Sequence, residues 1–211
     1  MTRRLVFWRH GRTAWNAAGR VQGLSDIPLD EVGRRQAVNA AVLLAALEPV
    51  RIVSSHLERA IETAQVLGQV TGVPVEKEAR LQEMNFGIRE GLTMAEAMEQ
   101  LPTQMAAWLA NRDMRMPGGE TYAEAAARFH SGVEEIADAL GADQTAVIVS
   151  HGAVMRVGVC AFLGLPQEHW RALGGFNNCA WSVLEEGRDR WRMTEWNAGT
   201  LPEPVLSDDE T

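Results

Sequence analysis

The fold of this chain is decided by the stretch LVFWRHGRT, residues 5–13. A short apolar run bounded by charge and glycine is typical of a buried strand. Arg9 and His10 follow this run, so they would lie where the strand leaves the sheet. In open α/β sheets ligands bind at the carboxyl edge of the strands. The stretch therefore predicts both a central strand and the location of a site.

Composition limits the class of protein. The 211 residues are 46% hydrophobic and 23% charged, with a net charge of -8. These values are typical of a globular protein and argue against binding to nucleic acid or to a membrane surface. The two cysteines form neither a disulfide framework nor a metal-ligand spacing, and their apolar surroundings favour inert thiols. With no signal peptide or membrane-spanning run recognisable, a cytoplasmic protein is expected.

Alternating strand and helix patterns indicate one domain over residues 1–200. Helices are expected at about 30–47, 57–70, 121–140 and 152–163, with two short ones between 93 and 116; strands at 5–8, 52–54, 75–78, 147–150, 180–184 and 191–196. Residues 92–117, rich in methionine, form either ordinary packed helices or a lid. The acidic, proline-bearing segment 201–211 is expected to be disordered.

Three junctions repeat one pattern, in which an apolar run ends in polar residues and a helix begins. They deliver Arg9 with His10, then Arg59, then His151. If the strands are parallel neighbours, these groups meet at one edge, where helix N-termini add backbone N–H donors. Guanidinium groups match phosphate oxygens. The predicted ligand is a phosphoryl group.

The two histidines and one carboxyl suggest the chemistry. A neutral imidazole can attack phosphorus, and a second imidazole can donate hydrogen bonds to the transferring oxygens. The departing alkoxide needs a proton, and Glu83, in a partly apolar loop, is the carboxyl best placed to supply it. The alternative for Glu83 is a surface carboxylate that caps a turn.

Taken together, the motifs resemble those of the histidine phosphatase superfamily, also called the phosphoglycerate mutase-like family. In chain order they are Arg9-His10-Gly11, Asn16, Gln22-Gly23, SSHLERAIETA, LQEMNFGIREG, PGGET and VSHG. The resemblance implies a three-layer α/β/α sandwich with a mostly parallel sheet. It also implies a reaction without metal or other cofactor, in which His10 is phosphorylated within a pocket of Arg9, Arg59 and His151, and Glu83 is the proton donor and then the base.

The resemblance also implies substrate-binding positions. Asn16, Gln22 and Gly23 match phosphate-loop positions, and Gly152 follows the second histidine. Arg12 departs from the family, which usually has Glu or Gln there; it either holds a substrate carboxylate or faces solvent. The segments WRALGGFNNCAWSVLE and RWRMTEWNAG resemble the subfamily that hydrolyses glucosyl-3-phosphoglycerate.

The expected activity is a phosphomonoesterase acting on a small sugar-phosphate or phosphoglycerate ester. A cofactor-dependent phosphoglycerate mutase is the main alternative, and the modest lid favours hydrolysis. A non-catalytic anion-binding module and a metallohydrolase are less favoured, the second because no HxH or HExxH spacing occurs. Tryptophans in the last two strands either pack internally or form the surface of a homodimer.

Overall fold

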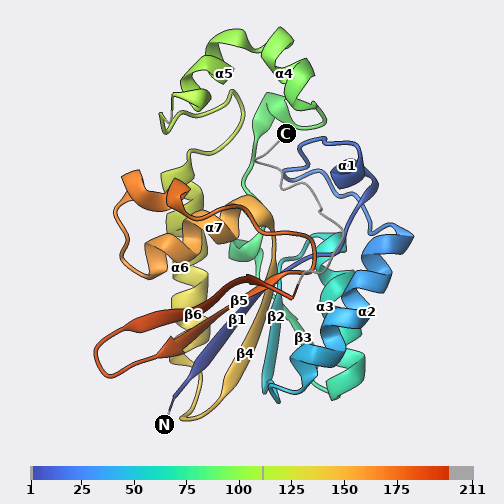
Figure 1. Ribbon diagram of the computed structural model, residues 1–211, viewed down its shortest axis with the longest axis vertical. Coiled ribbons are helices and arrows are strands. Elements are labelled where there is room, and N and C mark those ends of the chain that lie inside the picture. Colours follow the sequence, from blue (N-terminus) through green and yellow to red (C-terminus); the bar gives the residue numbers. More distant parts are fainter. Residues whose placement is uncertain (1, 111, 200–211) are drawn as a thin grey trace.

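The computed structural model of the protein describes residues 2–110 and 112–199, and the predicted disordered tail lies outside them. Six strands form one sheet, in the order β3-β2-β4-β1-β5-β6 (Figure 1). They are β1 (Arg4–Arg9), β2 (Arg51–Ser54), β3 (Val75–Lys77), β4 (Thr145–Ser150), β5 (Trp181–Glu186) and β6 (Trp191–Ala198). β3, β2, β4 and β1 run parallel, and β5 pairs antiparallel with both β1 and β6. The predicted mostly parallel sheet is confirmed.

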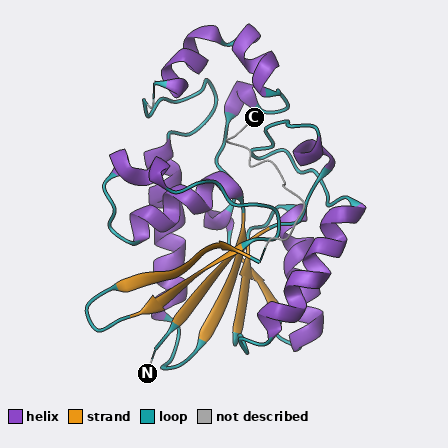
Figure 2. Ribbon diagram, viewed as in Figure 1, coloured by secondary structure: helices purple, strands orange, loops and turns teal. Residues whose placement is uncertain are grey.

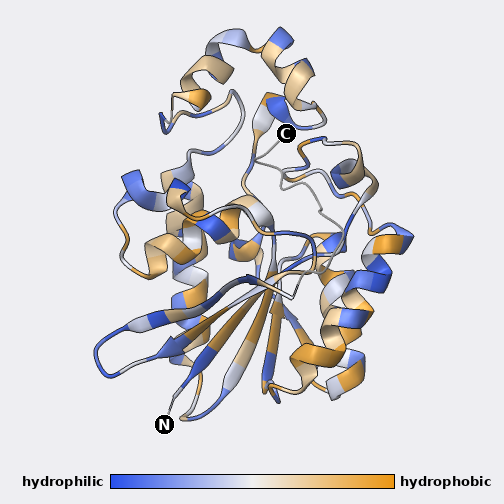
Figure 3. Ribbon diagram, viewed as in Figure 1, coloured by the Kyte–Doolittle hydropathy of each residue, from blue (hydrophilic) through white to orange (hydrophobic). Residues whose placement is uncertain are grey.

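Helices cover both faces of the sheet (Figure 2). The main ones are α2 (Glu31–Ala45), α3 (Glu58–Thr71), α6 (Tyr122–Asp138) and α7 (Gly152–Phe162). On β1, Leu5 and Phe7 pack with residues of α6 and α7, whereas Val6 and Trp8 pack with residues of α2 and α3. Successive side chains of a strand point to opposite faces, so a strand buried on both faces must be apolar throughout. This is why β1 reads as a continuous apolar run, and Figure 3 shows the same concentration of apolar residues in the central strands.

Between β3 and β4 along the chain lie two short helices, α4 (Met94–Gln100) and α5 (Pro102–Leu109). Both are beyond the carboxyl edge of the sheet (Figure 1). Ala97, Met105 and Met116 make a small buried cluster that is separate from the two clusters flanking the sheet. Met94 and Met114 pack against this cluster, whereas Met98 is exposed. We call residues 92–117 the lid segment.

Short elements were missed by periodicity because each is too brief to show a repeat. They are the helix α1 (Ala14–Ala17) and the 3₁₀ turns η1 (Ala79–Leu81), η2 (Gly87–Arg89) and η3 (Gln167–Ala172). Cys160 and Cys179 are buried and free, as predicted, and burial raises the pKa of the Cys160 thiol to about 11. None of the helices in the described part of the chain has the length and apolar character needed to span a bilayer.

Candidate active site

His10 lies directly after the carboxyl end of β1 and is almost fully buried. Its Nδ1 is 2.7 Å from the carbonyl oxygen of Gly11, and the Nε of Arg59 donates to its Nε2 at 3.3 Å. A carbonyl only accepts, so Nδ1 carries the proton and Nε2 keeps its lone pair. Burial, together with the guanidiniums of Arg59 and Arg9, holds the pKa of His10 well below its usual range. The ring is therefore a neutral imidazole whose unprotonated Nε2 has the lone pair that a nucleophile needs.

Arg59 is in the first turn of α3 and is fully buried. Besides its contact with His10, it donates from Nη1 to the carbonyl of Ser25 and from Nη2 to the carbonyl of Gly23, both at 2.8 Å. The residue 23–25 loop is held in turn by the carboxylate of Glu90, which accepts from Leu24 N and Ser25 Oγ at 3.0 Å. The guanidinium of Arg59 is thus fixed between His10 and the residue 23–25 loop.

Gly23 has a structural reason to be glycine. Its φ is +54°, and a Cβ there would lie 2.1 Å from Oε1 of Glu90. Any side chain would push Glu90 away from the loop that orients Arg59. Gly23 thus contributes its backbone, whose carbonyl accepts from Arg59.

Arg9 and Gly152 are packed against each other. Arg9 is fully buried and donates from Nη1 to the carbonyl of Phe176. A Cβ at Gly152 would lie 3.3 Å from Cζ of Arg9. Gly152 therefore leaves room for this guanidinium at the start of α7.

His151 precedes α7 as its N-cap and is fully buried. Its ring centroid lies 5.1 Å from that of His10, so the two predicted histidines do meet. Nε2 is 2.8 Å from Oγ of Ser55. Burial lowers the pKa of His151 well below its ordinary value, and the charge of Arg59 adds to this.

Glu83 is also buried, and its carboxylate sits at the N-terminus of α7. Oε1 accepts from the backbone N–H of Met84 and of Val154 at 2.8 Å, and Oε2 accepts from that of Ala153 at 3.2 Å. An anion is favoured at a helix N-terminus. Since α7 begins directly after His151, this places Glu83 at the same end of the sheet. The turn-capping alternative is partly right, because the carboxylate does bind backbone N–H groups, but it is not on the surface.

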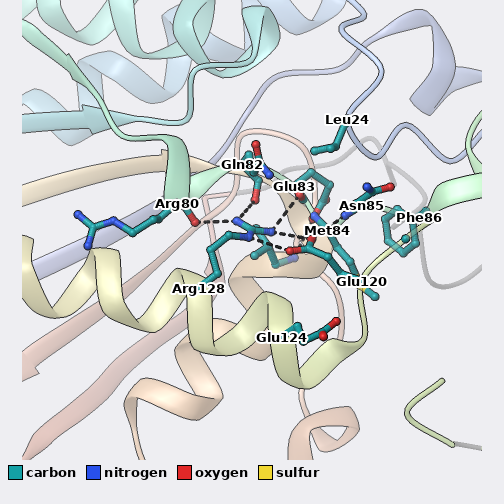
Figure 4. Close-up of polar contacts among 12 residues, drawn as sticks. Leu24, Arg80, Gln82, Glu83, Met84, Asn85, Phe86, Glu120, Glu124 and Arg128 are labelled. Carbon is teal, nitrogen blue, oxygen red and sulfur yellow. Dashed lines mark hydrogen bonds and ion pairs between the residues drawn. The ribbon is translucent and has the colours of Figure 1, made fainter. Parts of the chain in front are cut away.

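Arg128 supports the segment that carries Glu83 (Figure 4). From α6 it donates to the carbonyls of Gln82 and Glu83, at 3.0 and 3.3 Å, and pairs with the carboxylate of Glu120. Glu120 also accepts from Asn85 N at 2.9 Å. The Glu83 loop is therefore fixed to the helical layer along its main chain.

Asn16 and Gln22 belong to one buried network. The hydroxyl of Thr13 lies 3.1 Å from Oδ1 of Asn16 and 3.0 Å from Oε1 of Gln22. Nδ2 of Asn178 reaches both Asn16 Oδ1 and the carbonyl of His10, at 3.2 Å. Nε2 of Gln22 is buried without a hydrogen-bond partner among residues 2–110 and 112–199, which leaves it a donor for a ligand.

Arg12 is outside this cluster of side chains. Its Nε makes an ion pair with Oδ2 of Asp30, the N-cap of α2, at 2.8 Å. The pair favours a structural role, so nothing here supports a substrate carboxylate at Arg12. His56, next to Ser55 in sequence, is exposed.

The sequence did not identify Thr13, Ser55, Glu90 or Asn178 as site residues. Each contacts a site residue or the loop beside one. Thr13 contacts Asn16 and Gln22, and Ser55 contacts His151. Glu90 holds the loop at Arg59, and Asn178 donates to the carbonyl of His10. The feature of the sequence that could have indicated Ser55 and Asn178 is that each lies near the end of a strand. Ser55 directly follows β2, and Asn178 shortly precedes β5. A polar residue at a strand end is too common to have been chosen on that ground alone.

The chain was compared with known proteins. The family model described as "Histidine phosphatase superfamily (branch 1)" matches residues 5–199. A glucosyl-3-phosphoglycerate phosphatase of Mycobacterium tuberculosis is 40% identical, with 93% of this chain and 95% of that protein covered. A probable phosphoglycerate mutase GpmB of Cronobacter sakazakii is 35% identical, with 89% and 87% covered.

Solved structures are similar as well. A mycobacterial glucosyl-3-phosphoglycerate phosphatase in complex with VO3 has a TM-score of 0.87 at 40% identity, with 93% of this chain and all of that one covered. The resemblance predicted from the motifs, to this superfamily and to its glucosyl-3-phosphoglycerate phosphatases, is confirmed as a similarity of sequence and of fold.

Proposed function

The chain belongs to the histidine phosphatase superfamily and is a phosphatase, and from this premise we propose that it hydrolyses a small phosphoglycerate-type or sugar-phosphate monoester through a phosphohistidine at His10. The observation that supports this most directly is the state of His10. Its Nε2 has no proton, accepts from Arg59 at 3.3 Å and belongs to a ring 5.1 Å from that of His151.

In the first step, the lone pair of Nε2 attacks phosphorus and the bond from phosphorus to the ester oxygen breaks. The phosphoryl group moves to His10, and the ester oxygen leaves with the bonding pair. Arg9, Arg59 and His151 surround the transferred group with donors that stabilise its charge, which is where most of the rate enhancement of such sites arises. Asn16, Gln22 and the backbone around Gly23 and Gly152 complete the cradle.

Glu83 is the proposed proton donor to the departing alkoxide. It must be protonated at that moment, and the approach of a phosphoryl dianion to its buried carboxyl favours the neutral form. As a carboxylate, the same group then removes a proton from water, which attacks phosphorus and releases phosphate from His10. Glu83→Gln should slow hydrolysis of esters with poor leaving groups far more than that of p-nitrophenyl phosphate.

The alcohol is proposed from the relatives. Proteins about 40% identical along nearly the whole chain are named glucosyl-3-phosphoglycerate phosphatases, so that ester is the first substrate to test. A screen should compare it with phosphoglycerates, sugar phosphates and phosphoserine. A preference of less than tenfold in kcat/KM for glucosyl-3-phosphoglycerate over all of these would reject the proposed alcohol. The proposed phosphomonoester hydrolysis would still stand.

A cofactor-dependent phosphoglycerate mutase remains the second candidate, because one relative at 35% identity is named a probable mutase. The same pocket would then shield phosphohistidine from water. Phosphate release from 3-phosphoglycerate, with and without 2,3-bisphosphoglycerate, separates the two. Trapping an acid-labile phosphoryl group on the wild type but not on His10→Ala would exclude a non-catalytic anion-binding module.

Three finer statements remain proposals. The reaction is expected to need no metal ion, so a chelator should leave the rate unchanged within about twofold. The protein is expected in the cytoplasm, where it binds neither nucleic acid nor a membrane. A homodimer is the third, to be tested by light scattering of the full chain.

A further inference from the structure

The hydroxyl of Ser55 is the only hydrogen-bond partner that the described part of the chain offers to the His151 ring. We propose that Ser55 is a positioning residue that fixes His151 as the tautomer with the proton on Nδ1, so that this N–H can donate to the transferring phosphoryl group. The proposal rests on the proposed function for its consequence, but the tautomer itself is a property of the protein without substrate.

Ser55 is held firmly. It follows β2, is fully buried, and its backbone N–H donates to the carbonyl of Val149 at 2.9 Å. Its Oγ accepts from the backbone N–H of Leu57 at 3.3 Å and lies 2.8 Å from Nε2 of His151. The serine, the start of α3 and the histidine at the end of β4 are therefore linked by one hydroxyl.

Donors and acceptors decide the direction of the bond between Ser55 and His151. In one arrangement the hydroxyl donates to Nε2, every group on Ser55 is used, and Nδ1 carries the ring proton. In the other, Nε2 donates to the hydroxyl, whose own proton then has no acceptor among residues 2–110 and 112–199. Nδ1 has no partner among these residues in either arrangement, so the hydroxyl proton alone distinguishes the two. Each buried polar group without a partner costs about 1–3 kcal/mol, so the first arrangement is favoured.

Binding of a phosphoryl group would also require the tautomer of His151 that is protonated on Nδ1. The oxygens of a phosphoryl dianion only accept hydrogen bonds, so the histidine nitrogen that meets them must be a donor. Nδ1 of His151 is the ring nitrogen without a protein partner in the described residues, which leaves it for the ligand. Because burial keeps His151 neutral, protonating both nitrogens is not an easy alternative.

His10 and His151 would then share one tautomer but use it in opposite ways. In His10, Nδ1–H donates to the carbonyl of Gly11, and the lone pair of Nε2 is the one that would attack phosphorus. His151 occupies its Nε2 with Ser55 and offers the Nδ1 proton. The ring nitrogen that is hydrogen-bonded to the protein therefore decides the role of each histidine. His10 is left as a nucleophile, and His151 is left as a hydrogen-bond donor.

The test combines nitrogen NMR with kinetics on the full chain. Long-range ¹⁵N–¹H spectra of ¹⁵N-labelled protein at pH 8 report which ring nitrogen is protonated, and signals absent in His151→Gln identify this ring. Ser55→Ala removes the hydroxyl and Ser55→Thr keeps one. Ser54→Ala is the matched control, because the neighbouring Oγ donates to the carbonyl of Ser55 and not to His151.

We expect the Nδ1-protonated form in the wild type, in Ser54→Ala and in Ser55→Thr, and a mixture in Ser55→Ala. In the same variant, kcat for p-nitrophenyl phosphate should fall roughly 10- to 100-fold, the size of effect seen when a residue that orients a site ligand is removed. Ser55→Thr should recover most of this loss.

A wild-type His151 protonated on Nε2 would overturn the proposal, and this result does not depend on any variant folding. An unchanged tautomer in Ser55→Ala would overturn it too, as would a changed tautomer with unchanged kcat. If the wild type hydrolysed no phosphomonoester, the proposed function would fail, yet the wild-type spectrum would still decide the tautomer.

Discussion

The carboxyl edge of the sheet and the lid segment are held in very different ways. At the edge, His10 and His151 directly follow buried strands and Arg59 lies in the first turn of α3. Each of the three side chains is fixed by carbonyls or a hydroxyl. The lid segment has only a small core, in which Met105 is fully buried, and is tied to the body by contacts such as Trp108 Nε1 to the hydroxyl of Tyr122 at 2.8 Å.

This difference indicates a division of labour. Groups that react with phosphorus need fixed positions, because rates depend steeply on their geometry. Recognition of the alcohol needs only about 1.4 kcal/mol for each tenfold preference, which a weakly held segment can provide. We therefore expect changes at the edge to affect every substrate, and changes in the lid segment to affect the choice among them.

The largest effect is expected for His10→Ala. Without a nucleophile, kcat should fall roughly 10⁴-fold or more for all phosphomonoesters alike, as for other covalent catalysts. Phosphate release measures this, and circular dichroism checks that the variant is folded. Substantial residual turnover of only one substrate would contradict the expectation that changes at the edge affect all substrates alike.

Arg59→Lys should come next, with kcat lower by roughly 10²- to 10³-fold. An ammonium cannot bond the carbonyls of Gly23 and Ser25 together with Nε2 of His10, so the fork geometry is lost. Arg51→Lys is the control, because that arginine pairs with Glu76 at the surface. Similar losses in both variants would mean that the fork has no special role.

The two buried histidines should make stability depend on pH. In the folded protein the pKa of His10 and that of His151 both lie below the ordinary value of about 6.5, which the unfolded chain retains. Below that pH the unfolded state binds more protons, so the free energy of unfolding falls by at most about 1.4 kcal/mol per pH unit for each group, down to the folded pKa.

Urea unfolding at pH 7.5 and 5.5 measures this loss. His151→Gln should lose less stability between the two pH values than the wild type, whereas His169→Gln, at an exposed position, should match the wild type. Equal losses in all three proteins would show that the edge histidines are not kept neutral by burial.

The smallest effect is expected in the lid segment. Met105→Ala opens a space in its small core, so kcat/KM for glucosyl-3-phosphoglycerate should fall about tenfold more than that for p-nitrophenyl phosphate. Leu44→Ala, in the core under α2, should lower the melting temperature without changing this ratio. A constant ratio in both variants would remove the lid segment from substrate choice.

Much of the fold follows from local pattern. The apolar runs of β1 and β4 are long enough to be recognised as strands buried on both faces, and the capping box of Thr121 with Glu124 marks the start of α6. The motifs placed His10 and His151 directly after strands and Arg59 at the start of the helix that follows another strand. A parallel sheet brings such ends together, so their meeting was predictable.

The sequence alone thus determined which elements form and which reactive groups share an edge, because strand burial and helix capping depend on neighbouring residues. Only the tertiary structure decided what each group touches. It paired Arg12 with Asp30, bound the Glu83 carboxylate to the backbone N–H of Ala153 at the N-terminus of α7 and set Ser55 against His151, since those partners are 18, 70 and 96 positions apart along the chain. Contacts between segments so distant depend on how the layers pack, which no local pattern encodes.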